Sequence, residues 1–179
     1  PGGEHKETLE TGTKSAALGG IVGIFEMPNT NPLTVTPEAM EFKLKRASET
    51  AYVDYAFYFG GTAENSSNLS EWENLKGVCG IKIFMGSSTG SLLSATDEEI
   101  DKIFANGKRV IAVHAEDEAM MNENKMTILK DSNDVKMHNI WRSEESCFNA
   151  TKRVVSIAKK YNRPVHVLHI TTAQEMDYL

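Results

Sequence analysis

Short apolar runs alternate with longer polar segments along the chain, and this alternation is the first indication of the fold. The runs are rich in β-branched and aromatic residues, and Pro28 and the pair Gly60-Gly61 directly follow two of them. Such runs are typical of strands, because proline and glycine interrupt a ladder. Five strands are therefore predicted, at residues 21–27, 52–59, 80–85, 109–114 and 164–170.

The segments between these runs carry helix signals. Thr36 precedes Pro37, a favourable pair for an N-cap and a first helical position. Thr96 is followed three residues later by Glu99, which is the spacing of a capping box. Residues 61–74 read as a loop that leads into a short helix. Longer helices are predicted over residues 7–18, 37–50, 97–104 and 141–160, the last with Cys147, Thr151, Val154, Val155 and Ala158 on one face.

Strands that are apolar almost throughout, each followed by a helix, predict an α/β fold in which helices cover a parallel sheet. An open doubly wound sheet and a portion of a (β/α)8 TIM barrel both show this pattern, and the spacing of the elements does not choose between them. No repeat, low-complexity tract or linker interrupts residues 1–179, so a single domain is expected.

Composition excludes several classes of partner. The 179 residues include 25 acidic and 19 basic side chains, which gives a formal charge of −6. Without a basic stretch the chain is not expected to bind nucleic acid or an anionic membrane surface, and no apolar run is long enough for a transmembrane helix. Cys79 and Cys147 are too few for a disulfide framework or a thiolate zinc site, which favours a cytoplasmic location.

Three side chains lie where a parallel α/β fold places its chemistry, which is at the carboxyl ends of the strands. Lys82 lies in one predicted strand, and His114 and His169 lie at the ends of two others. Each histidine alone is equally well explained as a core residue bonded to the backbone, but the three together indicate a site. His166 precedes His169 by three residues, so strand alternation predicts that it faces the helices.

Lys82 has apolar neighbours on both sides. A structural lysine there would extend its amine to the rim of the fold or pair with a carboxylate. Alternatively, burial lowers the pKa of the amine, and the neutral amine can add carbon dioxide to form a carbamate whose two oxygens bridge two metal ions. With His114 and His169 this arrangement predicts a zinc site, because neutral imidazole suits zinc.

Several segments resemble the dihydroorotases of the cyclic amidohydrolase superfamily, in the right order and over essentially the whole chain. The segment PGGEHKETLETGTKSAALGG, followed by MPNTNP, is similar to the stretch that comes directly after the first metal-binding motif of that family. Its carbamylated-lysine strand resembles GIKIFMGSSTG, and the strands of its third and fourth histidine ligands resemble VIAVHAED and RPVHVLHITTAQE. Hydantoinases, dihydropyrimidinases and allantoinases share the lysine strand and HAED.

The resemblance implies strands two to six of a (β/α)8 barrel and two zinc ions, bridged by carbamylated Lys82 and held by His114 and His169. The activity it implies is the metal-dependent, reversible hydrolysis of dihydroorotate to N-carbamoyl-aspartate in pyrimidine biosynthesis. Asn29, in MPNT, matches the residue that binds the substrate carboxylate, although a turn after Pro28 would also explain it. Residues 87–90 are a candidate lid over the substrate.

The chain departs from the family at both ends. The H-x-H motif of the family's first strand would lie before Pro1, and its catalytic aspartate beyond Leu179, so no catalytic residue is assigned within the chain. A fragment, or the covered part of a longer protein, is expected, since such a barrel is roughly twice this length. The expected partners are a small-molecule substrate and further copies in a homo-oligomer. Another cyclic amidohydrolase, or a non-catalytic subunit that binds aspartate transcarbamoylase, is the alternative.

Overall fold

The computed structural model of the chain describes residues 2–86, 92–129 and 134–179. Within these residues, five parallel strands form one sheet in the order β1-β2-β3-β4-β5. Each new strand therefore pairs with the one before it, as in a barrel, whereas a doubly wound sheet reverses its order at a switch point. The strands are β1 (Gly23–Glu26), β2 (Asp54–Gly60), β3 (Val78–Phe84), β4 (Ile111–His114) and β5 (Val165–Val167), which confirms the five predicted runs.

The predicted helices form with small changes at their ends. The hydroxyl of Thr96 accepts from the Glu99 N–H at 3.3 Å, and the Glu99 carboxylate accepts from the Thr96 N–H at 3.1 Å, which is the expected capping box. The last long helix begins after Ser143 rather than at residue 141, because the Ser143 hydroxyl caps it. The longer helices are α1 (Leu9–Leu18), α2 (Pro37–Thr50), α4 (Asp97–Ala105), α5 (Glu118–Ile128) and α7 (Glu144–Tyr161). None of the described helices is both long and apolar enough to cross a bilayer.

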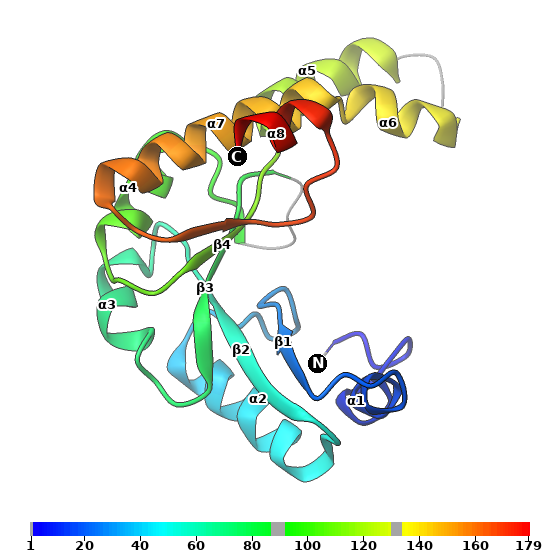
Figure 1. Cartoon of the computed structure of the whole chain (residues 1–179), viewed down its shortest axis with the longest axis vertical. Helices are drawn as coiled ribbons and strands as arrows, with labels where there is room; N and C mark the ends of the chain where they lie inside the picture. Colours follow the sequence, from blue (N-terminus) through cyan, green and yellow to red (C-terminus); the bar gives the residue numbers. More distant parts are fainter. Residues whose placement is uncertain (1, 87–91, 130–133) are drawn as a thin grey trace.

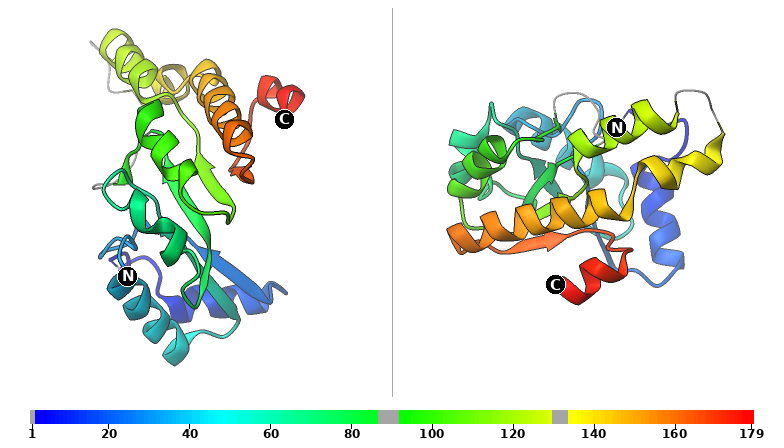
Figure 2. Two further views of the ribbon diagram at one scale, coloured as in Figure 1. Left: turned by 90° about the vertical axis from the view of Figure 1, so that its left-hand side faces the viewer. Right: turned by 90° about the horizontal axis from the view of Figure 1, so that it is seen from above.

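Short helical turns complete the chain, and sequence patterns are weakest in these. The 3₁₀ turn η1 (Ser66–Asn68) leads into α3 (Leu69–Trp72), and both lie within residues 61–74, the stretch predicted as a loop that leads into a short helix. A second 3₁₀ turn, η3 (Val135–Met137), continues into α6 (His138–Trp141), and α8 (Ala173–Tyr178) follows β5. No pattern in the sequence predicts α5, α6 or α8. Figure 2 shows α5 and α6 packed together beyond the end of the sheet.

The sheet is curved, with α2, α3, α4 and α7 on its convex side (Figure 1). The core lies between the sheet and these outer helices, so every second strand residue points into it. The core residues from the strands are Phe57, Phe59, Val78, Ile81, Ile83, Ile111 and Val113, and those from α2, α4 and α7 are Met40, Ala47, Ile100, Ile103, Phe104, Ala150, Val154 and Ala158. The structure is thus part of a barrel wall.

One prediction about strand direction is wrong. Val165 and Val167 pack against the core, so His166 lies on the opposite, concave side of β5 and is exposed. The prediction counted alternation back from His169, but β5 ends at Val167 and His169 has a left-handed φ of 42°. That left-handed residue interrupts the strand geometry, so the two histidines do not alternate.

Candidate metal site

Two histidines from adjacent strands meet at the carboxyl edge of the sheet. His114 is the last residue of β4, and His169 follows β5. The Nδ1 atom of His114 lies 2.9 Å from the Nε2 atom of His169. The left-handed conformation of His169, with φ at 42°, is uncommon outside glycine and turns the chain at this point. Strained backbone of this kind is often found at functional sites.

The pair is compatible with a shared metal ion. Two imidazole nitrogens that bind one tetrahedral zinc at 2.0–2.1 Å stand about 3.3 Å apart, so the observed pair would open by only a few tenths of an ångström. Within residues 2–86, 92–129 and 134–179, no group of three or more His, Cys, Asp and Glu side chains forms a metal site by itself. A metal ion at this edge would therefore need further ligands beside the two imidazoles.

Behind His114 stands a buried carboxylate that the sequence analysis did not single out. The Glu116 Oε2 atom lies 2.5 Å from the Nε2 atom of His114, on the side of the ring opposite His169. Arg142 donates to both carboxylate oxygens of Glu116, with Nε at 2.9 Å from Oε1. Burial alone would raise the pKa of Glu116, but the hydrogen bonds from His114 and Arg142 outweigh it and lower that pKa to about 2. The carboxylate is therefore ionised.

Lys82 is buried in β3, with 2% of its surface exposed. Its Nζ donates to the Ile83 carbonyl at 2.6 Å and lies 3.4 Å from the centre of the Phe84 ring. Within the described residues no carboxylate forms an ion pair with it, and desolvation lowers its pKa from 10.5 to about 7. A neutral amine is therefore accessible near physiological pH, as the sequence predicts.

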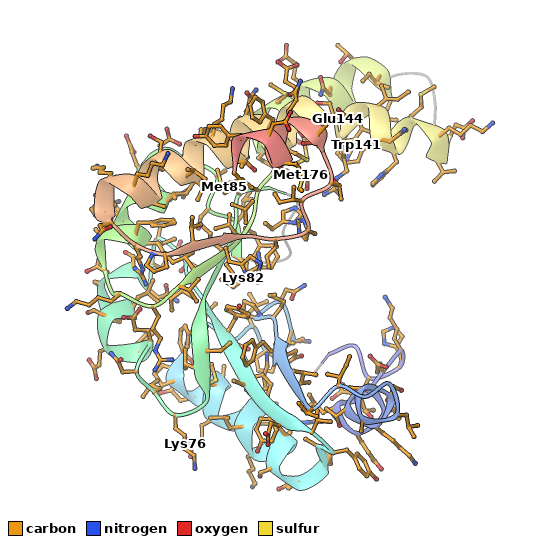
Figure 3. The ribbon with its side chains drawn as sticks, in the orientation of Figure 1. Lys76, Lys82, Met85, Trp141, Glu144 and Met176 are labelled. Carbon is orange, nitrogen blue, oxygen red and sulfur yellow. The ribbon has the colours of Figure 1, made fainter. Side chains whose placement is uncertain are left out.

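The lysine lies near the histidines without touching them. Phe84 pairs with His114 across β3 and β4, and their rings are 6.0 Å apart. The positive charge of Lys82 contributes, after desolvation and His114, to lowering the pKa of His169. Figure 3 places Lys82 on the concave side of the sheet. All three predicted metal ligands thus gather at one edge of adjacent strands, with the Phe84 ring next to both the amine and the His114 imidazole.

Asn29 is not brought into contact with this group. It is exposed in the turn that follows β1, and no hydrogen bond joins its side chain to the histidines or to Lys82 in the described part of the chain. Thr34 donates its backbone N–H to the Pro28 carbonyl at 3.0 Å, so the turn is ordered independently of Asn29. The candidate lid at residues 87–90 lies outside the described residues. A cavity of about 310 Å³ adjoins the histidines, between Arg142, Cys147 and Glu175.

Comparisons with known proteins identify the family of the chain. The family model described as "Dihydro-orotase-like" matches residues 1–158. The chain belongs to the dihydroorotase-like family. A dihydroorotase of Thermococcus kodakarensis is 32% identical over 172 residues, which cover 94% of this chain and 36% of that protein. A dihydroorotase of Staphylococcus epidermidis is 33% identical over 181 residues, covering 98% of this chain and 41% of that protein.

Solved structures of cyclic amidohydrolases establish the fold independently. The L-hydantoinase of Arthrobacter aurescens superimposes with a TM-score of 0.87 at 28% identity, over 96% of this chain and 39% of that one. A D-hydantoinase superimposes with a TM-score of 0.80 at 25% identity. The chain thus spans 36–41% of the length of the dihydroorotases above, and its curved five-stranded sheet is a portion of an amidohydrolase TIM barrel.

Proposed function

We propose that the protein is a zinc-dependent dihydroorotase, which hydrolyses the cyclic amide of dihydroorotate reversibly to N-carbamoyl-aspartate in cytoplasmic pyrimidine biosynthesis. The observation that carries this proposal is the histidine pair, in which Nδ1 of His114 and Nε2 of His169 face each other at 2.9 Å beside the buried amine of Lys82. Family membership and the dihydroorotase relatives support the choice of substrate.

Each residue has a role that follows from its chemistry. His114 and His169 would hold metal through neutral imidazole nitrogens. The neutral amine of Lys82 would attack the carbon of carbon dioxide, so that an N–C bond forms and the electron pair of one C=O π bond moves to its oxygen. Water takes the proton from the nitrogen, which leaves an anionic carbamate whose oxygens could hold metal. When bound, the metal ions lower the pKa of water and polarise an amide carbonyl. Asn29 would donate its side-chain amide to the substrate carboxylate.

A hydantoinase is the second candidate, because the structure of the Arthrobacter aurescens L-hydantoinase superimposes over nearly the whole chain. Both reactions open a cyclic amide, so the metal site alone does not separate them. Dihydroorotate carries a carboxylate, which needs a donor such as Asn29. We expect the complete protein to hydrolyse dihydroorotate faster than hydantoin or dihydrouracil, and the opposite preference would favour the hydantoinase.

Two buried lysines provide a matched test of the metal site. Lys82 has no carboxylate partner among the described residues, whereas Lys43, 1% exposed, pairs with Glu26 at 3.0 Å on the helix side of the sheet. In the complete protein, Lys82→Met should remove most bound zinc and most activity. Lys43→Met removes a lysine of equal burial away from the site, so the folded variant should keep both. Parental zinc content in Lys82→Met would refute the ligand assignment.

A further inference from the structure

The His114 ring is fixed from both sides. Its Nδ1 faces His169, and its Nε2 lies 2.5 Å from the Glu116 carboxylate, whose side chain is only 8% exposed. Glu116 follows β4 by two residues, so the strand end that carries the imidazole also carries this carboxylate. The two ring nitrogens therefore have different surroundings, a buried carboxylate for one and a second imidazole for the other.

Arg142 determines what the carboxylate can do. Its guanidinium binds Glu116 through two nitrogens, Nε to Oε1 at 2.9 Å and Nη2 to Oε2. An arginine stays charged at all ordinary pH values and a carboxylate paired with it only accepts hydrogen bonds. The hydrogen between Glu116 and His114 must then belong to the Nε2 atom of the imidazole. Its Nδ1 is left with a lone pair directed at His169.

We infer that Glu116, held in place by Arg142, is a positioning residue that selects the Nε2–H tautomer of His114 and so makes Nδ1 the metal-binding nitrogen. A carboxylate behind a ligating imidazole fixes the orientation of its ring and increases its basicity. Both carboxylate oxygens accept from Arg142, and Oε2 also faces the Nε2 atom of His114, so Glu116 is oriented toward the ring. The inference rests on the proposed function only in that a metal is held at the histidines.

The surroundings of Arg142 explain why the carboxylate is held firmly. Arg142 lies between α6 and α7, directly before Ser143, whose hydroxyl caps α7 by accepting from the Ser146 N–H at 3.3 Å. Its guanidinium carbon also lies 5.6 Å from the centre of the Trp141 ring. The start of a long helix thus anchors the arginine, and the orientation of His114 depends on residues far from it in the sequence.

The decisive variant is Glu116→Gln. With Arg142 donating to the amide oxygen, the amide NH₂ of the variant faces the Nε2 atom of His114 and can only donate to it. Nε2 must then accept, so the proton should move to Nδ1, which loses the lone pair that would bind metal. Tautomers are read from ¹⁵N-histidine NMR spectra of the metal-free complete protein, and zinc affinity from competition with a chelator. We expect an Nε2–H signal for His114 in the parent, an Nδ1–H signal in the variant, and about 10- to 100-fold weaker zinc binding.

Glu175→Gln is the matched control. Glu175 is a buried carboxylate beside the same cavity, but it accepts from Thr151 at 2.6 Å and from Thr172 at 2.8 Å, and among the described residues no hydrogen bond joins it to a histidine. Its folded variant should keep the parental tautomer and zinc affinity. If Glu116→Gln does not fold, Arg142→Met provides the same test, since it frees the carboxylate to rotate and should also weaken zinc binding.

Three results would overturn the inference: an unchanged tautomer in Glu116→Gln, parental zinc affinity in folded Glu116→Gln or Arg142→Met, or equal losses in Glu175→Gln. These readouts are independent of the proposed activity. A protein that fails to hydrolyse dihydroorotate but shows the tautomer change would refute the function and support the inference. A protein that hydrolyses dihydroorotate but whose zinc affinity is unaltered by Glu116→Gln would support the function and refute the inference.

Discussion

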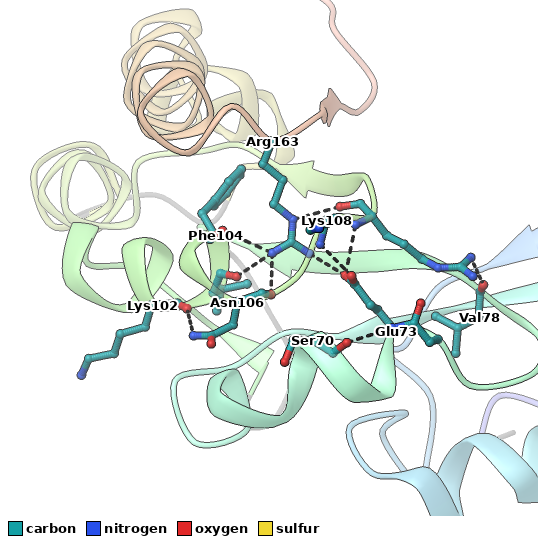
Figure 4. A network of polar contacts seen from close by, with 11 residues as sticks. Ser70, Glu73, Val78, Lys102, Phe104, Asn106, Lys108 and Arg163 are labelled. Atoms are coloured by element: carbon teal, nitrogen blue, oxygen red, sulfur yellow. Dashed lines mark hydrogen bonds and ion pairs between the residues drawn. The ribbon is translucent and has the colours of Figure 1, made fainter.

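Replacing Arg163 by methionine should strongly destabilise the fold while leaving the candidate metal site of the folded molecules unchanged. Arg163 lies between α7 and β5, and its side chain is 2% exposed. Its Nη2 binds the Glu73 carboxylate at 2.9 Å (Figure 4). The remaining guanidinium nitrogens donate to the carbonyls of Ile103, Phe104, Asn106 and Arg109, at 2.6 to 3.3 Å. One side chain thus joins the segments before β4 and β5.

The expected loss in the free energy of unfolding follows from the burial and the hydrogen bonds that Glu73 would keep. Its carboxylate accepts from the backbone N–H groups of Lys108 at 2.6 Å and Arg109 at 3.2 Å, and it is 4% exposed. Arg163→Met would leave this charge buried without its cation, and breaking a buried pair in this way costs about 3–5 kcal/mol. Arg163→Lys should not restore the loss, because an ammonium cannot match the planar set of acceptors.

Urea unfolding of the complete protein, at constant m-value, measures this effect. Arg153→Met, in α7, is the control, because Arg153 is likewise an ion-paired arginine, with Asp97 and Asp117 as its partners, but its side chain is 29% exposed. That pair should contribute at most about 1 kcal/mol. Adding Glu73→Gln to Arg163→Met should recover part of the loss, since no buried charge remains. A loss below about 1 kcal/mol in Arg163→Met, similar to that in Arg153→Met, would refute the reasoning.

Three further predictions concern the site and the chain. Because burial lowers the pKa of Lys82 from 10.5 to about 7, the folded state binds fewer protons than the unfolded state between these values, so stability rises with pH there. Lys82→Met should therefore stabilise the metal-free protein most below about pH 7 and hardly at about pH 10, and equal gains at both would contradict this. Asn29→Ala should raise KM for dihydroorotate without changing zinc content, and unaltered kinetics would leave Asn29 as a turn residue. A polypeptide limited to residues 1–179 should associate in sedimentation experiments, because Ile21 and Val22 at one edge of the sheet are 52% and 82% exposed. A stable monomer would instead show that these residues form a self-sufficient domain.

Local patterns in the sequence were sufficient for the strands and most helices. The strands β2 and β3 are nearly continuous apolar runs because both of their faces are covered or crowded, and such runs are recognisable without tertiary information. The Thr96 capping box is also a short-range feature. By contrast, the apolar residues of α5 are Ala119, three methionines and Ile128, and within this helix only Met121 is buried. A helix with so little buried surface leaves no clear periodic signal.

The candidate site was predictable only in part, for a different physical reason. Lys82, His114 and His169 stand out because polar side chains in or beside apolar strands are unusual. Glu116 and Arg142 are ordinary charged residues in polar segments, 26 positions apart, and their pairing exists only after α6 and α7 are placed. The prediction for the direction of His166 was wrong for a similar reason, since no sequence pattern marks His169 as the left-handed residue that breaks the alternation.

The position of the two polar networks along β4 explains why stability and chemistry can be tested separately. The carbonyl of Arg109, just before the strand, accepts from Arg163 at 2.9 Å, whereas His114 at the end of the strand faces His169. A strand rises about 3.3 Å per residue, so five residues place the two groups roughly 16 Å apart. In TIM barrels the amino-terminal face serves stability and the carboxyl-terminal face carries the chemistry. The buried charge of Arg163 is therefore matched by fixed acceptors at one end of the sheet. At the other end, Lys82 lacks a carboxylate partner among the described residues. This lack favours the neutral amine that carbamate formation requires.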